Sequence, residues 1–199
     1  MSHVVALPRA RTLVLADLIP GALARDIALV AGGAGLVGAL AQIAVHVPGT
    51  PVPITGQTLG VLLIGSAYGA RRAAATIALY AVAGVLGVPW FAGHGSGYSG
   101  ASFGYVVGFF AAATLCGFLA ERGADRSVLR SIPAMLAGEI VMYAIGMAWL
   151  AVAAQLTWSQ TFTEGLTPFL LGDAVKAALA AGLLPAAWAL TGRSRRSAS

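Results

Sequence analysis

The chain has 199 residues, of which 58% are hydrophobic and 10% are charged, and its formal net charge is +5. Soluble domains have about a quarter of their residues charged, so a water-soluble fold of this size could not hide so much apolar surface. The composition therefore excludes a soluble domain. It also argues against nucleic-acid binding, because the arginines lie in short gaps between apolar runs and not along one basic face.

Apolar runs that could cross a bilayer recur along the chain. A helical span needs roughly 20 mostly apolar residues to cross about 30 Å of hydrocarbon. Five runs meet this requirement, and a shorter one, TLGVLLIGSAYG, would by length also fit a re-entrant or interfacial segment. In chain order the predicted spans cover residues 27–47, 58–69, 72–89, 103–121, 132–154 and 168–190. We therefore predict an all-α fold, a bundle of six transmembrane helices.

The arginines determine the number of spans and their orientation, because cytoplasmic loops carry an excess of Lys and Arg. With six crossings all arginines fall on one side, and the opposite loops, 48–57, 90–102 and 155–167, contain neither Lys nor Arg. The arginines are Arg9, Arg11, Arg25, Arg71, Arg72, Arg122, Arg126, Arg130, Arg193, Arg195 and Arg196. Five spans would invert the second half of the chain against this rule. Both termini are thus predicted to be cytoplasmic.

These spans divide the chain into three parts. Residues 1–26 are predicted to form a cytoplasmic segment, residues 27–190 the transmembrane domain, and residues 191–199 a basic cytoplasmic tail. The leading segment mixes apolar residues such as Leu15 and Leu18 with charges, so it would lie as an interfacial helix or as a frayed tail.

The first predicted span carries two rows of small residues. One row is Ala31, Gly35 and Ala39, and the other is Ala34 and Gly38. Small residues four apart let another helix approach closely in a membrane. The rows therefore indicate either packing inside the chain or docking of a different membrane subunit.

Ionisable residues within the spans are the first candidates for a functional site, because each costs roughly 2.5–3.5 kcal/mol to insert. Asp173 and Lys176 are three residues apart on the last span, so they share one helix face in the outer half of the membrane. The pair either neutralises itself and merely makes the helix insertable, or it binds a polar ligand from outside, which we favour. For Glu139, nearer the cytoplasmic side, we favour a helix–helix hydrogen bond over a partner contact.

Other chemistry is sparse in this sequence. It contains no Walker A motif, so any active transport must take its energy from partner proteins. No Ser–His–Asp constellation and no His or Glu cluster stands out, and Cys116 is the only cysteine. We predict no enzyme activity, no metal site and no catalytic cofactor. The glycine-rich stretch PWFAGHGSGYSGASFGY predicts a flexible lid or simply a tight connection.

Four short segments, taken in their order and spacing, form a fairly specific pattern. They are PVPITGQTLGVLLIG at 51–65, GVPWFAG at 87–93, GASFGYVVGF at 100–109 and PFLLGDAVKAALA at 168–180. The pattern resembles the BioY family, the biotin-specific substrate-binding subunits of energy-coupling factor (ECF) vitamin transporters. The resemblance covers about residues 27–190, but the chain departs from the family's usual run at residues 101–103, where no contact can be carried over.

The resemblance implies six helices in a bacterial cytoplasmic membrane and an outward-facing biotin pocket partly closed by the first loop. It also implies that Ala31, Gly35 and Ala39 face an ECF transmembrane coupling subunit, and that two cytoplasmic ATPases complete the transporter. Asp173 and Lys176 match the family's pair on the last helix.

Biotin would suit such a site, because it offers two ureido N–H groups, a carbonyl, an apolar thiolane ring and a carboxylate. We expect Asp173 to accept hydrogen bonds from the ureido group or otherwise orient the vitamin, with Lys176 as its partner and a ligand contact. Weaker candidates for walls and polar contacts are Thr55, Gln57, Trp90, Phe91 and Tyr105.

Three other functions remain open. A subunit of the same architecture could take thiamine or riboflavin through different polar contacts. A small membrane enzyme could use Glu139 or Asp173 as an acid or base, although no second catalytic group lies at a defined spacing. A structural membrane subunit without a ligand is the third possibility, but it would give no role to the ion pair and the glycine-rich loop.

Overall fold

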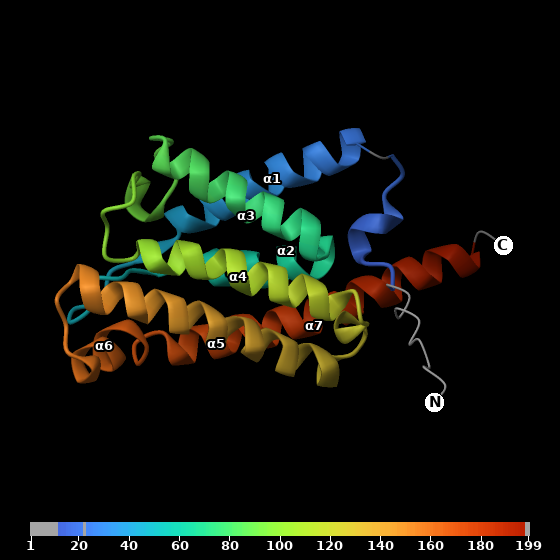
Figure 1. The fold of residues 1–199 in the computed structure, drawn as a ribbon. Coiled ribbons are helices and arrows are strands. Elements are labelled where there is room, and N and C mark those ends of the chain that lie inside the picture. Colours follow the sequence, from blue (N-terminus) through green and yellow to red (C-terminus); the bar gives the residue numbers. More distant parts are fainter. Residues whose placement is uncertain (1–11, 22, 198–199) are drawn as a thin grey trace, which may run out of the picture.

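The structure, a computed structural model, describes residues 12–21 and 23–197, with side chains described up to residue 191. In this part of the chain there are seven α-helices, and the long ones run along a common axis (Figure 1). The helices are α1 (Leu23–Gln42), α2 (Gln57–Tyr68), α3 (Ala70–Val85), α4 (Phe103–Ala120), α5 (Val128–Ala153), α6 (Trp158–Gly165) and α7 (Leu170–Ser197). Short 3-10 helices are η1 (Leu15–Leu18), η2 (Ala92–His94) and η3 (Ala124–Arg126).

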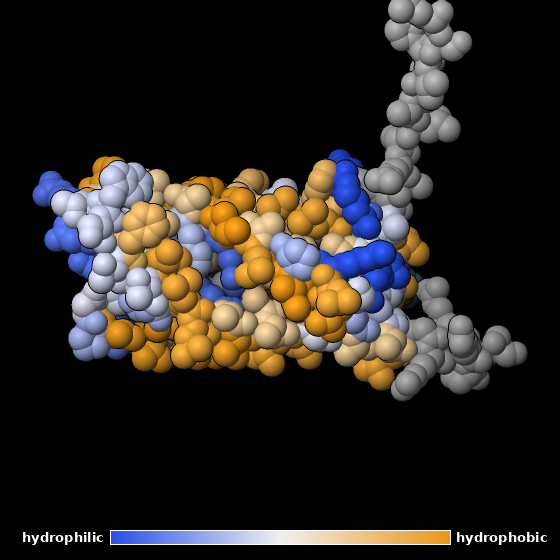
Figure 2. Space-filling model, turned by 90° about the horizontal axis from the view of Figure 1, so that it is seen from below, coloured by the Kyte–Doolittle hydropathy of each residue, from blue (hydrophilic) through white to orange (hydrophobic). Residues whose placement is uncertain are grey.

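Among the residues that the structure describes, four helices are long and apolar enough to cross a membrane, namely α1, α4, α5 and residues Leu170–Thr191 of α7. Hydrophobic side chains cover most of the middle of the face in Figure 2, whereas hydrophilic ones gather toward its two ends. The predicted helical bundle is therefore confirmed. The predicted count of six spans is not established by these four helices, because α2 and α3 are shorter.

The shortest of the predicted spans, α2, lies at the centre of the bundle. It contacts α1, α3, α4 and α7, and eight of its 12 residues are buried. A helix that is apolar all round is typically buried in protein. Because neighbouring helices surround it, α2 does not need the full length of a lipid-exposed span. Its first two residues, Gln57 and Thr58, are buried, so the helix begins inside the bundle.

Close helix packing around α4 depends on glycines. A Cβ at Gly108 would lie 2.7 Å from the carbonyl oxygen of Met142 on α5, and one at Gly65 of α2 would lie 2.8 Å from the carbonyl oxygen of Ala113. Both distances are too short for any side chain. The backbones of α2, α4 and α5 thus approach closely, as small residues allow in membrane bundles.

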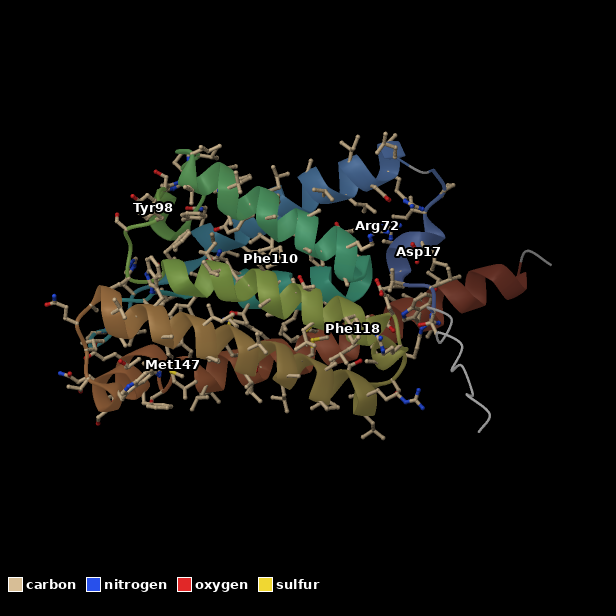
Figure 3. The ribbon with its side chains drawn as sticks, in the orientation of Figure 1. Asp17, Arg72, Tyr98, Phe110, Phe118 and Met147 are labelled. Carbon is tan, nitrogen blue, oxygen red and sulfur yellow. The ribbon has the colours of Figure 1, made fainter. Side chains whose placement is uncertain are left out.

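The two ends of the bundle differ in charge. The described chain ends and η3 lie at one end, whereas α6 and the loop after α3 lie at the other (Figure 1). Arg72 and Asp17 lie side by side at the first end, and Tyr98 lies at the opposite end (Figure 3). This arrangement agrees with the predicted separation of arginine-bearing loops from loops without arginine. We call the end with Tyr98 the loop end.

The predicted leading segment is partly folded against the bundle. Val14 and Ala16 are buried and pack with Ala120, and the Asp17 carboxylate accepts a 2.7 Å ion-paired hydrogen bond from Arg72. Residues 12–19 thus contain the 3-10 helix η1, and residues 23–26 of the predicted segment already belong to α1, while residues 1–11 and 22 lie outside the described residues.

The first residues of the predicted basic tail, 191–197, continue α7 as a helix. Residues 198–199 of that tail lie outside the described part of the chain. Two further elements were not expected from the sequence. They are a two-stranded antiparallel sheet of β1 (Ala44–Val45) and β2 (Ile54–Thr55), and the eight-residue helix α6. β2 and α6 fall in segments that the sequence predicts to be outer loops, whereas β1 falls in the last residues of the predicted first span, 27–47.

Candidate functional site

A cavity of about 230 Å³ lies at the loop end of the bundle. Its walls come from the loop that contains β2, from the glycine-rich loop at residues 92–102, and from helices α2, α3, α4, α5 and α7. The polar and phenolic residues that line it include Thr55, Gln57, Thr58, Tyr80, Tyr105, Tyr143, Asp173 and Lys176. We call this space the central cavity.

Asp173 and Lys176 form a buried ion pair in the wall of the central cavity. The Lys176 Nζ lies 2.8 Å from Asp173 Oδ1, and the two side chains are only 15% and 5% exposed, respectively. Nζ also donates a 2.7 Å hydrogen bond to the backbone carbonyl of Thr55. Asp173 lies in the first turn of α7, where the helix dipole favours a negative charge. The structure thus brings three of the predicted site residues together.

Tyr143 on α5 completes the environment of Asp173. Its hydroxyl donates a hydrogen bond to Asp173 Oδ2, so both carboxylate oxygens have a donor. Sequence reasoning missed this residue. The available signal was a tyrosine inside a strongly apolar span, because a buried tyrosine hydroxyl usually finds a hydrogen-bond partner.

Gln57 anchors a second polar group in the cavity wall. Its Nε2 donates a 2.8 Å hydrogen bond to the Tyr80 hydroxyl, and its Oε1 accepts one of 3.1 Å from the Thr55 hydroxyl. Gln57 is 5% exposed, so these partners fix its amide at the N-terminal end of α2. Tyr80 was not predicted, and it links α3 to this network.

Aromatic rings form the apolar walls of the central cavity. The Tyr105 hydroxyl donates a 2.7 Å hydrogen bond to the carbonyl of Gly165, and its ring packs near Tyr143 and Phe169, with centroids 6.2 and 6.4 Å away. Across the cavity lining, Phe91 contacts the Phe103 ring at 6.3 Å between centroids. Predicted residues Tyr105 and Phe91 therefore line the cavity, together with Phe103 and Phe169, which were missed.

Trp90, in contrast, lies behind the wall. Its ring packs against Tyr80 at 5.2 Å between centroids, and its Nε1 donates a 3.0 Å hydrogen bond to the Tyr80 carbonyl. The Trp90 carbonyl accepts from the Gln42 side chain at 3.1 Å. Trp90 is not among the residues that line the central cavity, because the turn before η2 directs Phe91 there instead.

Glu139 does not make the helix–helix hydrogen bond that we expected. It is 8% exposed, and its Oε1 is buried without a hydrogen-bond partner among the described residues. Asp173 and Lys176 of α7, which influence Glu139 electrostatically, bond instead to each other, to Tyr143 and to Thr55.

The two rows of small residues on α1 differ in burial. Ala34 and Gly38 are buried, and a Cβ at Gly38 would lie 3.2 Å from the Trp90 side chain. Ala31, Gly35 and Ala39 are exposed, and no atom of the described residues lies within 4 Å of a Cβ built at Gly35. The first row therefore packs inside the chain, whereas the second lies on an exposed face of α1.

The donors of the site suit an organic ligand. Within the described residues, no group of three or more His, Cys, Asp and Glu side chains is placed to hold a metal ion. The central cavity instead offers one ammonium, one carboxylate, one amide and several hydroxyls between aromatic walls. Such a combination fixes the orientation of a small, partly apolar molecule.

Comparison with known proteins gives a consistent assignment. Residues 10–193 match the model of the BioY family. The biotin transporter BioY of Rhizobium etli is 33% identical over an alignment that covers 79% of this chain and 89% of that protein. The biotin transporter BioY2 of Lactococcus lactis subsp. cremoris is 35% identical over 77% of this chain and 85% of that protein.

The fold has a solved counterpart. The crystal structure of the S-component for biotin from an ECF-type ABC transporter superposes with a TM-score of 0.74, covering 81% of this chain and 89% of that one, at 21% sequence identity. This likeness establishes the fold, while the family match and the relatives establish the descent. The chain belongs to the BioY family.

Proposed function

We propose that this protein captures biotin from the outer side of the membrane, as the substrate-specific subunit of an ECF-type transporter. Its relatives are named biotin transporters, and the similar crystal structure is an S-component for biotin. The observation that carries the proposal is the Asp173–Lys176 pair, which lies in the wall of a cavity with aromatic sides.

The chemistry of the central cavity supports this ligand. The Asp173 carboxylate can accept hydrogen bonds from ureido N–H groups, and the Lys176 ammonium can donate to a carbonyl or carboxylate. Phe91, Phe103 and Tyr105 would enclose the apolar thiolane ring and valerate chain. A volume of about 230 Å³ is just below the roughly 300–1,000 Å³ of drug-sized ligand sites, which suits a compact vitamin.

In this proposal the membrane is crossed six times, by α1 to α5 and α7, with both termini in the cytoplasm of a bacterium. The arginine-bearing end is then cytoplasmic, and the loop end with the central cavity faces outward. The short α2 fits as an internal helix, because its backbone polar groups are enclosed by neighbouring helices.

The partners in this proposal are the ECF transmembrane coupling subunit and two cytoplasmic ATPases. The exposed row Ala31, Gly35 and Ala39 is the proposed face toward the coupling subunit, because its residues are small and exposed and no atom of the described residues lies within 4 Å of a Cβ built at Gly35. The relatives are transporters, so we assign no catalytic reaction to the chain.

The decisive experiment is equilibrium binding of labelled biotin to the purified full chain in detergent, with unlabelled biotin, thiamine and riboflavin as competitors. We expect saturable binding that only biotin displaces. Displacement by thiamine or riboflavin would instead identify another vitamin, and recovery of a chemically altered ligand would point to an enzyme. No binding of any of the three by a folded, monodisperse sample would overturn vitamin capture and favour a structural subunit.

A further inference from the structure

One carboxyl group inside the bundle is not used by the proposed ligand site. Glu139 on α5 does not line the central cavity, yet it is 92% buried, since 8% of its surface is exposed. Its Oε1 is buried and has no hydrogen-bond partner within the described chain. A buried, unsatisfied polar atom of this kind needs a physical explanation.

The depth of Glu139 makes an ionised form unfavourable. It lies roughly 16 Å along the axis from Val128, the first residue of α5, at about 1.5 Å per residue. That is near the middle of a hydrocarbon layer about 30 Å thick. Ionisable residues at such depth are costly when charged, and they commonly pair or belong to a functional pathway.

The groups that face Glu139 can be named for each neighbouring helix. From α4 comes the thiol of Cys116, which donates to the Ala134 carbonyl at 3.5 Å, and from α5 comes Tyr143, one turn nearer the cavity. From α7 come Asp173 and Lys176, both within electrostatic range of Glu139. At this level α2 presents Leu62, which is apolar and packs beside Cys116.

The charges of this cluster balance only if Glu139 is neutral. The positive charge of Lys176 is matched by Asp173, which lies 2.8 Å away and also accepts from Tyr143. An ionised Glu139 would add a second negative charge with no cation of its own. The favourable state is therefore a carboxylic acid that carries its proton.

We propose that Glu139 is a proton-binding site inside the membrane, placed beneath the central cavity and linked electrostatically to the ligand held at Asp173 and Lys176. The proton-binding half follows from the geometry of Glu139 alone, while the linkage to ligand rests on the proposed function. Biotin is an anion at neutral pH, so an ionised Glu139 repels it wherever its carboxylate lies in the cavity.

The direction of the linkage follows from reciprocity. Ligand affinity falls as pH rises through the titration of Glu139, because the deprotonated form repels the anionic ligand. Bound ligand in turn makes Glu139 hold its proton more tightly, by the same factor. The substitution E139Q removes the titration and keeps a neutral side chain of nearly the same shape.

The first arm of the test needs no ligand. Infrared spectra of the purified full chain in H₂O and D₂O report the carbonyl band of a protonated carboxylic acid, which shifts on deuteration. We expect this band at neutral pH in the unsubstituted protein, and its diminution in E139Q. The control E164Q removes a carboxyl group on α6, outside the membrane-spanning helices, and should leave the band unchanged. A folded E139Q with an unchanged band would overturn the proton site.

The second arm measures the affinity for labelled biotin between about pH 6 and pH 9, where a free carboxyl group no longer titrates. We expect the affinity of the unsubstituted protein and of E164Q to fall about fivefold or more, a typical coupling between linked sites, and that of E139Q to stay level. Identical pH profiles of the unsubstituted protein and E139Q would overturn the linkage. Failure of every variant to bind biotin at any pH would overturn the proposed function and the linkage together, while the infrared band would still decide the proton site.

Discussion

The ammonium of Lys176 donates a 2.7 Å hydrogen bond to the backbone carbonyl of Thr55, so a charge on the last long helix is tied to the loop that contains β2. Lys176 also pairs with Asp173, which receives the hydroxyl of Tyr143 from α5. One cluster therefore joins three parts of the chain at the cavity wall. Because its members line the central cavity, a ligand that takes the place of Thr55 at Lys176 would also release the contact that holds the loop.

Asp173→Asn should abolish tight binding of biotin. Asparagine keeps the shape of the side chain but leaves Lys176 without a counter-charge, and breaking a buried pair in this way costs about 3–5 kcal/mol. We expect the affinity to fall at least roughly a hundredfold and the detergent-purified protein to melt at a lower temperature. Equilibrium binding and thermal unfolding measure the two effects. Glu164→Gln is the matched control, and an unchanged affinity of Asp173→Asn would contradict the assignment.

Replacing both charges separates a ligand-binding pair from a pair that merely neutralises itself. In the double variant Asp173→Asn with Lys176→Met, no unpaired charge is buried, so we expect its melting temperature to recover most of what either single substitution loses. Biotin binding should stay lost. Recovery of both stability and binding would show that the pair serves insertion of the helix and not the ligand.

Tyr143→Phe tests a site residue that the sequence did not indicate. The substitution removes one hydrogen bond to Asp173 and leaves the ring in place, which costs roughly 1–3 kcal/mol for a bond to a charged group. We therefore expect biotin affinity to fall roughly tenfold, as measured by equilibrium binding. Tyr98→Phe is the control, because Tyr98 is 64% exposed at the loop end. Equal affinities of the two variants would exclude a role for Tyr143 in holding Asp173.

The helices and the ion pair were predictable because each rests on a property of a single segment. Apolar runs of sufficient length gave the long helices, and two charges in one such run stood out against their surroundings. Spacing alone could not distinguish the row of Ala34 and Gly38 from the row of Ala31, Gly35 and Ala39. Only the packing of α1 against α3 and the Trp90 side chain decides which row is buried.

The missed residues depend on how distant segments meet. Tyr80 and Tyr143 become part of the site because Gln57 and Asp173, on other helices, reach their hydroxyls. Trp90 was predicted as a contact and lies behind Tyr80, since the backbone of the turn places Phe91 at the cavity instead. A sequence pattern does not record which of two adjacent aromatic residues points inward.

Asp125 makes the stability of the protein depend on pH at the arginine-bearing end. Its side chain is buried in η3 and accepts a 2.6 Å hydrogen bond from Trp188 Nε1. Burial raises the pKa of Asp125, although the Trp188 hydrogen bond and Arg126 act in the opposite direction. Because the folded state favours the protonated form, the stability from this group is complete below the ordinary carboxyl pKa. It is lost as pH rises through the raised value.

Asp125→Asn should therefore change how melting depends on pH. Asparagine can still accept from Trp188 and does not ionise, so relative to the unsubstituted protein it should gain stability as pH rises from about 4 to about 7. Thermal unfolding in detergent at several pH values measures this difference. Glu164→Gln is the control for loss of one negative charge. If the difference in melting temperature between Asp125→Asn and the unsubstituted protein were constant across this pH range, burial would not raise the pKa of Asp125.

Two glycines on one helix test the proposed docking face of α1. In Gly35→Leu the new side chain lies on the exposed face of α1, where no atom of the described residues lies within 4 Å of its Cβ, so biotin binding and melting temperature should be unchanged. A Cβ at Gly33 would lie 2.8 Å from Thr76, so Gly33→Leu should lower the melting temperature by overpacking that typically costs 1–3 kcal/mol. Co-purification with the ECF coupling subunit should fail for Gly35→Leu although the isolated subunit is intact. Normal co-purification and uptake by this variant would place the coupling subunit on another face.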